Sequence, residues 1–184
     1  MEWVSEERAA RVLMPKDVTL APAAPVHRPA VMHVTDIPFG NIDYASYALY
    51  CCYRALGRCK PNIFIHVCDP EVGKSNDRCV LRTDYGNVFM WPNTGSLGLL
   101  KTYFAERGIE TTLWTLNIDR LEALEQRRME ELTYAIPRTF HGRDVFAVAA
   151  GLLVGGVPMD AFAEPQDMKA LVGTNFSEKL TTLP

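Results

Sequence analysis

Apolar and polar positions change from strand spacing to helix spacing and back along the first half of the chain. Residues 30–34 and 62–68 are short apolar runs typical of buried strands, and residues 42–56 carry apolar side chains at helical spacing and end at Gly57. This order predicts a βαβ unit, in which the two strands pair in parallel through a right-handed crossover. We therefore expect an α/β fold with a mostly parallel central sheet flanked by helices.

The second half continues this alternation. Two short runs, 79–82 and 87–91, flank Asp84-Tyr85-Gly86 and predict a β-hairpin. The remaining pattern predicts a helix at 97–106, a strand at 111–116, a charged surface helix at 120–131 and an apolar helix at 145–154 that ends at Gly155-Gly156.

The two ends of the chain lack this regularity. A short helix is expected at 6–13, but Pro22 and Pro25 oppose regular structure after it, so residues 1–29 are expected to form an arm or linker. No strong periodicity follows residue 158. We therefore expect one α/β domain at 30–160 and a C-terminal tail at 161–184.

The helix expected at 42–56 is apolar or aromatic on almost every face. It carries Tyr44, Tyr47, Tyr50 and Tyr53 with Ala, Leu and Cys between them. Such a helix needs cover on more than one side. Packing inside the domain and burial in a subunit interface both remain open.

Composition restricts the classes of partner. The chain has 184 residues, of which 48% are hydrophobic, and this suffices for one sizeable core. A net charge of -3 and scattered Lys and Arg argue against nucleic acid. No stretch approaches the roughly 20 apolar residues of a membrane span, and the N-terminus lacks a basic start followed by an apolar core, so we expect a cytoplasmic protein without membrane contact.

Metal and disulfide chemistry are not expected either. The five cysteines include no pair at Cys-x-x-Cys spacing and are interpreted as reduced thiols that act as small hydrophobes. His27, His33 and His66 each lack a second ligand at metal spacing.

Polar residues interrupt two stretches that otherwise have a buried pattern. Asp69 follows the apolar run 63–67, and His141, Arg143 and Asp144 come directly before the apolar helix at 145–154. Both places suit catalysis or anion binding. Structural alternatives remain open: Asp69 can bond turn amides, His141 and Asp144 can cap the helix, and Arg143 can be an ion-pair partner.

Four motifs, in order, resemble those of the S-adenosylmethionine hydroxide adenosyltransferases, the family that also includes the fluorinase and chlorinase. The most specific is Phe-His-Gly-Arg-Asp-Val-Phe-Ala at 140–147, which is nearly identical to the family's Phe-His-Gly-Arg-Asp-Ile-Phe-Ala. The other three are Val-Met-His-Val-Thr-Asp-Ile-Pro-Phe-Gly-Asn-Ile-Asp at 31–43, Cys-Asp-Pro-Glu-Val-Gly at 68–73 and Met-Trp-Pro-Asn-Thr-Gly at 90–95.

The resemblance implies a reaction and a set of site residues. A water attacks C5′ of the ribose of S-adenosyl-L-methionine and expels L-methionine, so the small molecule is a substrate and no cofactor is needed. Asp69, Arg78 and His141 are the expected catalytic residues. Phe39, Asn93, Thr94, Phe140 and Arg143 are the expected substrate-binding residues. The resemblance also implies a homotrimer.

Several departures leave the function open. The family's opening ribose-binding segment has no counterpart in residues 1–30, and the family's C-terminal β domain is expected to be absent, because the chain ends near the linker. Asn76 stands at the position of the family's arginine, so that Arg78 either takes its role or the role is lost. Glu71 replaces a motif glycine and argues against halide chemistry.

Besides hydrolysis by this chain alone, two possibilities therefore remain. In one, the fold serves another small-molecule reaction of specialised metabolism, or acts as a binding module. In the other, a separate chain completes the pocket at an interface.

Overall fold

A computed structural model describes residues 37–57, 61–70, 78–128 and 140–173. Its centre is the hairpin of β2 (Arg78–Thr83) and β3 (Val88–Pro92), which pair antiparallel. Gly86 takes a φ of 81° in the turn, a left-handed value that glycine adopts without strain. The predicted hairpin is confirmed.

Three further strands complete a five-stranded sheet in the order β1-β3-β2-β4-β5. They are β1 (Ile63–Ile65), β4 (Thr111–Leu116) and β5 (Ala163–Gln166). β1 pairs with β3 in parallel, whereas the other three pairings of the described strands are antiparallel. The α/β class is confirmed, but the sheet is mixed rather than mostly parallel, because tightly connected strands such as β2 and β3 can only pair antiparallel.

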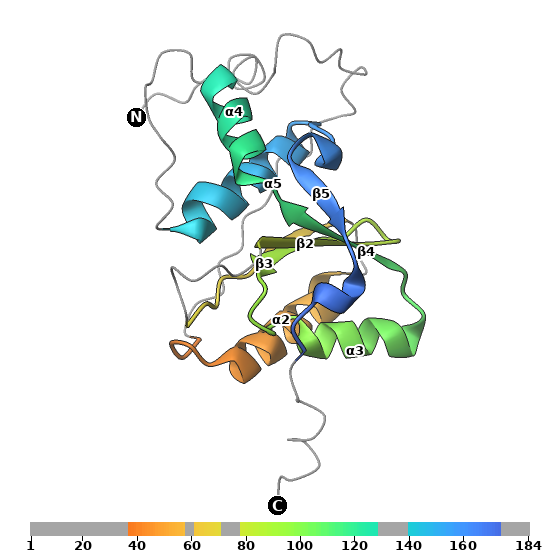
Figure 1. Cartoon of the computed structure of the whole chain (residues 1–184). Helices are drawn as coiled ribbons and strands as arrows, with labels where there is room; N and C mark the ends of the chain where they lie inside the picture. The colour runs from red at the N-terminus through yellow and green to blue at the C-terminus, as the bar shows by residue number, and fades with distance from the viewer. Residues whose placement is uncertain (1–36, 58–60, 71–77, 129–139, 174–184) are drawn as a thin grey trace, which may run out of the picture.

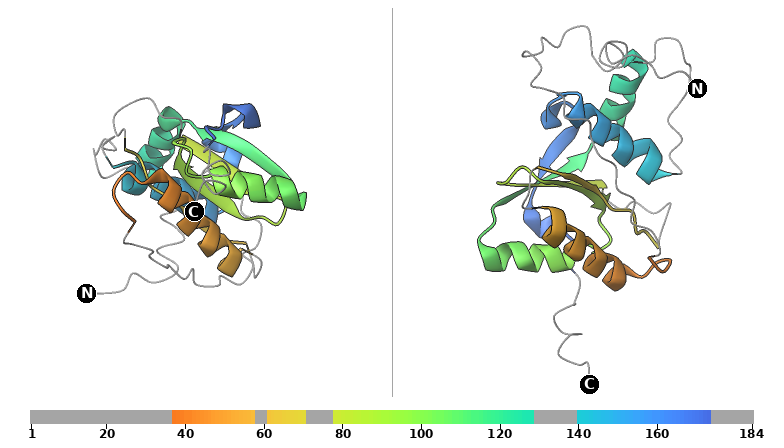
Figure 2. Two further views of the ribbon diagram at one scale, coloured as in Figure 1. Left: turned by 90° about the horizontal axis from the view of Figure 1, so that it is seen from below. Right: turned by 180° about the vertical axis from the view of Figure 1, so that it is seen from behind.

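Helices cover both faces of the sheet (Figure 1). One face carries α2 (Ile42–Leu56) and α3 (Gly98–Arg107), and the other carries α4 (Ile118–Arg128), the π-helical turn η1 (Gly142–Phe146) and α5 (Ala147–Val154). The view from behind shows the same layers (Figure 2).

The two faces of the sheet have different cores. Because side chains alternate along a strand, Phe89 and Trp91 of β3 face α2 and α3, whereas Val88 and Met90 face α5. The first core is aromatic, and in it the rings of Phe64 and Phe89 stack with centroids 4.8 Å apart. The second core is mostly aliphatic.

Helix α2 buries only part of its aromatic surface. Tyr53 is buried in the aromatic core and Tyr50 packs against it, as internal packing requires. Tyr44 and Tyr47 remain 49% and 53% exposed. Whether a second subunit covers these two tyrosines stays a prediction.

Most predicted elements are confirmed, with small shifts at their ends. The helix expected at 97–106 is α3, that at 120–131 begins two residues earlier as α4, and the strand expected at 62–68 is the shorter β1. The tail expected from residue 161 instead supplies β5, which pairs with β4, and Leu171, which is buried in the aromatic core. The strand expected at 30–34 and the helix expected at 6–13 lie outside the described residues.

The described residues were compared with the requirements of a membrane span and of a metal site. Within those ranges no helix is long and apolar enough to cross a membrane. The same ranges contain no cluster of three or more His, Cys, Asp or Glu that could hold a metal ion.

His66 is a buried polar residue directly after β1. Its backbone N–H donates to the Met90 carbonyl at 2.9 Å, but its Nε2 is buried without a hydrogen-bond partner. Burial disfavours the charged imidazolium and lowers the pKa of His66 to about 4. Protonation therefore opposes folding.

We predict that His66 makes the fold sensitive to acid. The unfolded state binds a proton near pH 6.5 while the folded state resists it to about pH 4, so stability is complete above pH 6.5 and falls as the pH drops through this window. The expected loss is about 2 kcal/mol by pH 5. Denaturant unfolding at pH 7.5 and 5 should show this difference in the native protein and a much smaller one in His66→Gln. Equal pH dependence in the two proteins would contradict it.

Candidate active site

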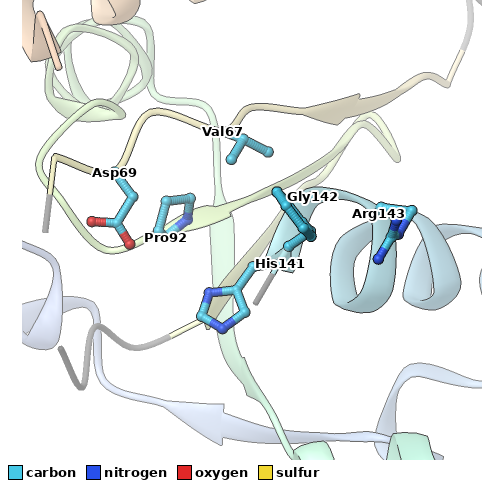
Figure 3. A pocket seen from close by; sticks show the side chains of 7 residues that line it. Val67, Asp69, Pro92, His141, Gly142 and Arg143 are labelled. Atoms are coloured by element: carbon cyan, nitrogen blue, oxygen red, sulfur yellow. The ribbon is translucent and has the colours of Figure 1, made fainter. Parts of the chain in front are cut away.

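The candidate site lies where β1 and β3 end. Because these strands are parallel, their carboxyl ends meet at one edge of the sheet, and η1 begins at the same edge. A cavity of about 350 Å³ opens there (Figure 3). It is lined by Val67, Asp69, Pro92, Phe140, His141, Gly142 and Arg143.

Asp69 reaches the cavity from the turn after β1. Thr94 Oγ1 donates to the carbonyl of Cys68, the residue before Asp69, at 2.8 Å. On its other side, the turn lies against Gly40, where an added Cβ would come within 3.4 Å of Pro70 Cβ. The Asp69 backbone is therefore held between the end of β3 and the loop before α2.

His141 reaches the cavity from the start of the helix that continues into α5. The first turn, η1, is π-helical, and the Ala147 N–H donates to the Gly142 carbonyl. A Cβ on Gly142 would lie 3.0 Å from Val67 Cγ2, so glycine allows this turn to approach the segment after β1 closely. Single π-turns are often found at functional sites.

Arg78 joins the site from β2. Its position opposite Pro92 at the start of β2 brings its guanidinium to His141, with Nη2 3.1 Å from Nε2. The structure thus brings together the three residues expected to be catalytic. Asp69 and His141 line one cavity, and Arg78 contacts His141.

Arg143 forms an ion pair with Asp144, which agrees with the structural alternative given for it from the sequence. Its Nε and Nη2 contact the two carboxylate oxygens of Asp144 at 2.5 and 3.0 Å. This hydrogen bonding from Arg143 lowers the pKa of the Asp144 carboxyl below its ordinary value. The guanidinium carbon also lies 5.1 Å from the centroid of the Phe140 ring. Arg143 and Phe140 both line the cavity.

The other residues expected to bind substrate do not line the cavity. Asn93 is buried, and its Nδ2 donates to the Ala170 carbonyl at 2.8 Å while its Oδ1 accepts from the Val172 N–H at 2.9 Å. The Thr94 hydroxyl is engaged with the Cys68 carbonyl. Phe39 is 96% exposed. The side chains of Asn93 and Thr94 therefore have structural partners, and substrate binding by these three residues stays a prediction.

Val67, Pro92 and Gly142 line the cavity without having been singled out from the sequence. The signals were present: strand alternation places Val67 on the same side as Asp69, and Pro92 and Gly142 belong to the motifs at 90–95 and 140–147. The resulting arrangement sets a carboxylate and an imidazole against apolar walls. Such a site can bind and orient a water molecule and accept a proton from it.

Comparisons with known proteins agree with the motifs. The model of the SAM hydroxide adenosyltransferase N-terminal domain matches residues 22–163. A protein of Methanocaldococcus jannaschii named (R)-S-adenosyl-L-methionine hydrolase is 33% identical over 111 residues, which are 60% of this chain and 34% of that protein. This chain thus spans about a third of that relative's length.

Two solved structures share the fold. An uncharacterized conserved protein from Thermotoga maritima superposes with a TM-score of 0.57 at 25% identity, over 76% of this chain and 47% of that one. A conserved hypothetical protein from Thermus thermophilus superposes with a TM-score of 0.52 at 20% identity, over 76% of this chain and 46% of that one, and supports the fold alone.

The family match covers most of the chain and includes every residue that lines the cavity. The resemblance drawn from the four motifs is confirmed. The chain belongs to the S-adenosylmethionine hydroxide adenosyltransferase family and carries the family's N-terminal domain.

Proposed function

We propose that this chain hydrolyses S-adenosyl-L-methionine at C5′ of its ribose and releases adenosine and L-methionine. The observation that carries this proposal is the convergence of Asp69 and His141 on one cavity, with Arg78 Nη2 3.1 Å from His141 Nε2. Family membership and the name of the Methanocaldococcus jannaschii relative support a SAM-cleaving reaction.

The reaction is a substitution at carbon. The water oxygen forms a bond to C5′ while the bond from C5′ to sulfur breaks, and the electron pair of that bond leaves with the sulfur of methionine. The water proton passes to a basic group of the site. Because the sulfonium is a good leaving group, positioning and desolvation of the water can supply much of the rate.

The contact between Arg78 and His141 divides the roles of the polar residues. A guanidinium only donates hydrogen bonds, so a hydrogen bond from Arg78 requires His141 Nε2 to accept, which places the ring proton on Nδ1. In this state His141 offers a donor rather than a base. Asp69 is then the group that accepts the water proton, and His141, oriented by Arg78, helps to hold the reacting molecules.

The apolar walls complete the site. Val67, Pro92 and Phe140 line the same cavity as Asp69. A substrate that fills the space between these walls displaces bulk water, which strengthens the interaction between the carboxylate and the one water that remains.

We predict that Asp69→Asn lowers kcat by roughly 10²- to 10⁴-fold, the usual contribution of a general base. The assay is liquid chromatography with mass spectrometry of S-adenosyl-L-methionine reactions in ¹⁸O-labelled water. Substitution at C5′ by water places the label in the 5′ hydroxyl of adenosine. Asp160→Asn, an exposed carboxylate on the 3-10 turn Met159–Ala161, is the matched control and should keep native turnover.

The products separate this reaction from the alternatives. Methylthioadenosine with homoserine lactone above the spontaneous background would replace hydrolysis by a lyase reaction. Unconsumed S-adenosyl-L-methionine would contradict the proposal and favour another small-molecule substrate for the same cavity.

A second prediction concerns the tautomer of His141. Because Arg78 donates to Nε2, the neutral ring should carry its proton on Nδ1. Two-bond ¹H–¹⁵N correlation spectra near pH 8, with the signal assigned by its loss in His141→Gln, should show this form. Arg78→Met should shift the ring toward the Nε2–H form, whereas Arg82→Met, an exposed residue of the same strand, should not. An Nε2–H tautomer in the native protein would refute the division of roles.

A further inference from the structure

The hydroxyl of Thr94 connects the two strand ends that form the cavity. Its Oγ1 donates to the Cys68 carbonyl at 2.8 Å and lies 3.3 Å from the Pro92 carbonyl. Cys68 precedes Asp69, and Pro92 lines the cavity. One side chain therefore ties the segment that carries the carboxylate to the end of β3.

The hydrogen bond between Thr94 and Cys68 lies beyond the last backbone pair of β1 and β3. β1 and β3 pair at three positions, from Ile63↔Val88 to Ile65↔Met90, and the His66 N–H adds a bond to the Met90 carbonyl. In the described residues, the next hydrogen bond between the two strand ends is that of Thr94, two residues beyond His66. The Thr94 hydroxyl thus extends the connection between the two strand ends to the residue that precedes Asp69.

The neighbouring residue anchors Thr94 in turn. The Asn93 side chain is only 8% exposed and bonds the backbone on both sides of Leu171, at Ala170 and Val172. Leu171 is buried in the aromatic core under the sheet. The dipeptide Asn93-Thr94 is therefore fixed to the core on one side and holds the Asp69 segment on the other.

We propose that Thr94 is a positioning residue for Asp69 and that Asn93, through residues 170–172, keeps Thr94 in place. The effect on turnover rests on the proposed hydrolysis. Loss of the Thr94 hydroxyl leaves the Cys68 carbonyl without this donor and lets the Asp69 segment move away from the cavity. A displacement of about 1 Å at a reacting group can cost on the order of 100-fold in rate.

The test compares Thr94→Val, which keeps the shape of the side chain but removes the hydroxyl, with Thr94→Ser, which restores it. With S-adenosyl-L-methionine as substrate, Thr94→Val should lower kcat by roughly 10- to 100-fold and leave KM within about 3-fold, because positioning acts on the chemical step. Thr94→Ser should recover most of kcat. Thr102→Val, which removes a similar hydroxyl bond to the Gly98 carbonyl in α3, is the control and should have native kinetics.

Hydrogen exchange supplies a measurement that does not need turnover. Amides in the peptide 66–69 should exchange faster in Thr94→Val than in the native protein and in Thr94→Ser. If the native protein does not consume the substrate, the proposed function fails, and exchange alone decides the positioning role. Unchanged exchange in Thr94→Val would overturn the inference, and so would a raised KM with native kcat, which would assign Thr94 to substrate binding.

Discussion

The parallel pairing of β1 with β3 is the constraint on which the site depends. Its register places Phe64 opposite Phe89, and their stacked rings are buried in the aromatic core. A shift of one residue would send Phe64 to the other face of the sheet, because side chains alternate along a strand. The packing of this aromatic pair therefore favours the register that brings the ends of β1 and β3 to one edge of the sheet, where the turn that carries Asp69 begins.

Polar side chains join the ends of neighbouring strands and helices by hydrogen bonds. Asn87 accepts from the Asn62 N–H and donates to the Gly57 carbonyl at 2.8 Å, which joins the hairpin to the end of α2 and the start of β1. Thr94 and Arg78 perform similar tasks at the opposite ends of the strands. Buried polar groups need partners, and His66 departs from this rule because its Nε2 has none in the described structure.

Periodicity predicted the elements whose burial pattern is strong. Helix α2, with its Asn41 cap and its apolar face, and the hairpin around Gly86 could be located almost to the residue. Strand β5 could not, because Ala163 is its only buried residue and Pro165 interrupts it, so this edge strand has no alternating pattern to detect. The mixed sheet was missed for a related reason: the order of strands in space depends on long-range pairing that no local pattern encodes.

The motifs predicted which residues line the cavity, but not the contacts that each of them makes there. Phe140, His141 and Arg143 were found from a contiguous stretch, whereas the contact of His141 with Arg78 spans 63 positions and depends on the antiparallel register of β2. In the proposed hydrolysis, that contact divides the roles of His141 and Asp69. Arg78 keeps its proton at any ordinary pH and can only donate, so the nitrogen facing it cannot serve as a base while the contact lasts. The carboxylate of Asp69 can only accept, and it is therefore the residue of the three whose chemistry suits removal of a proton from water.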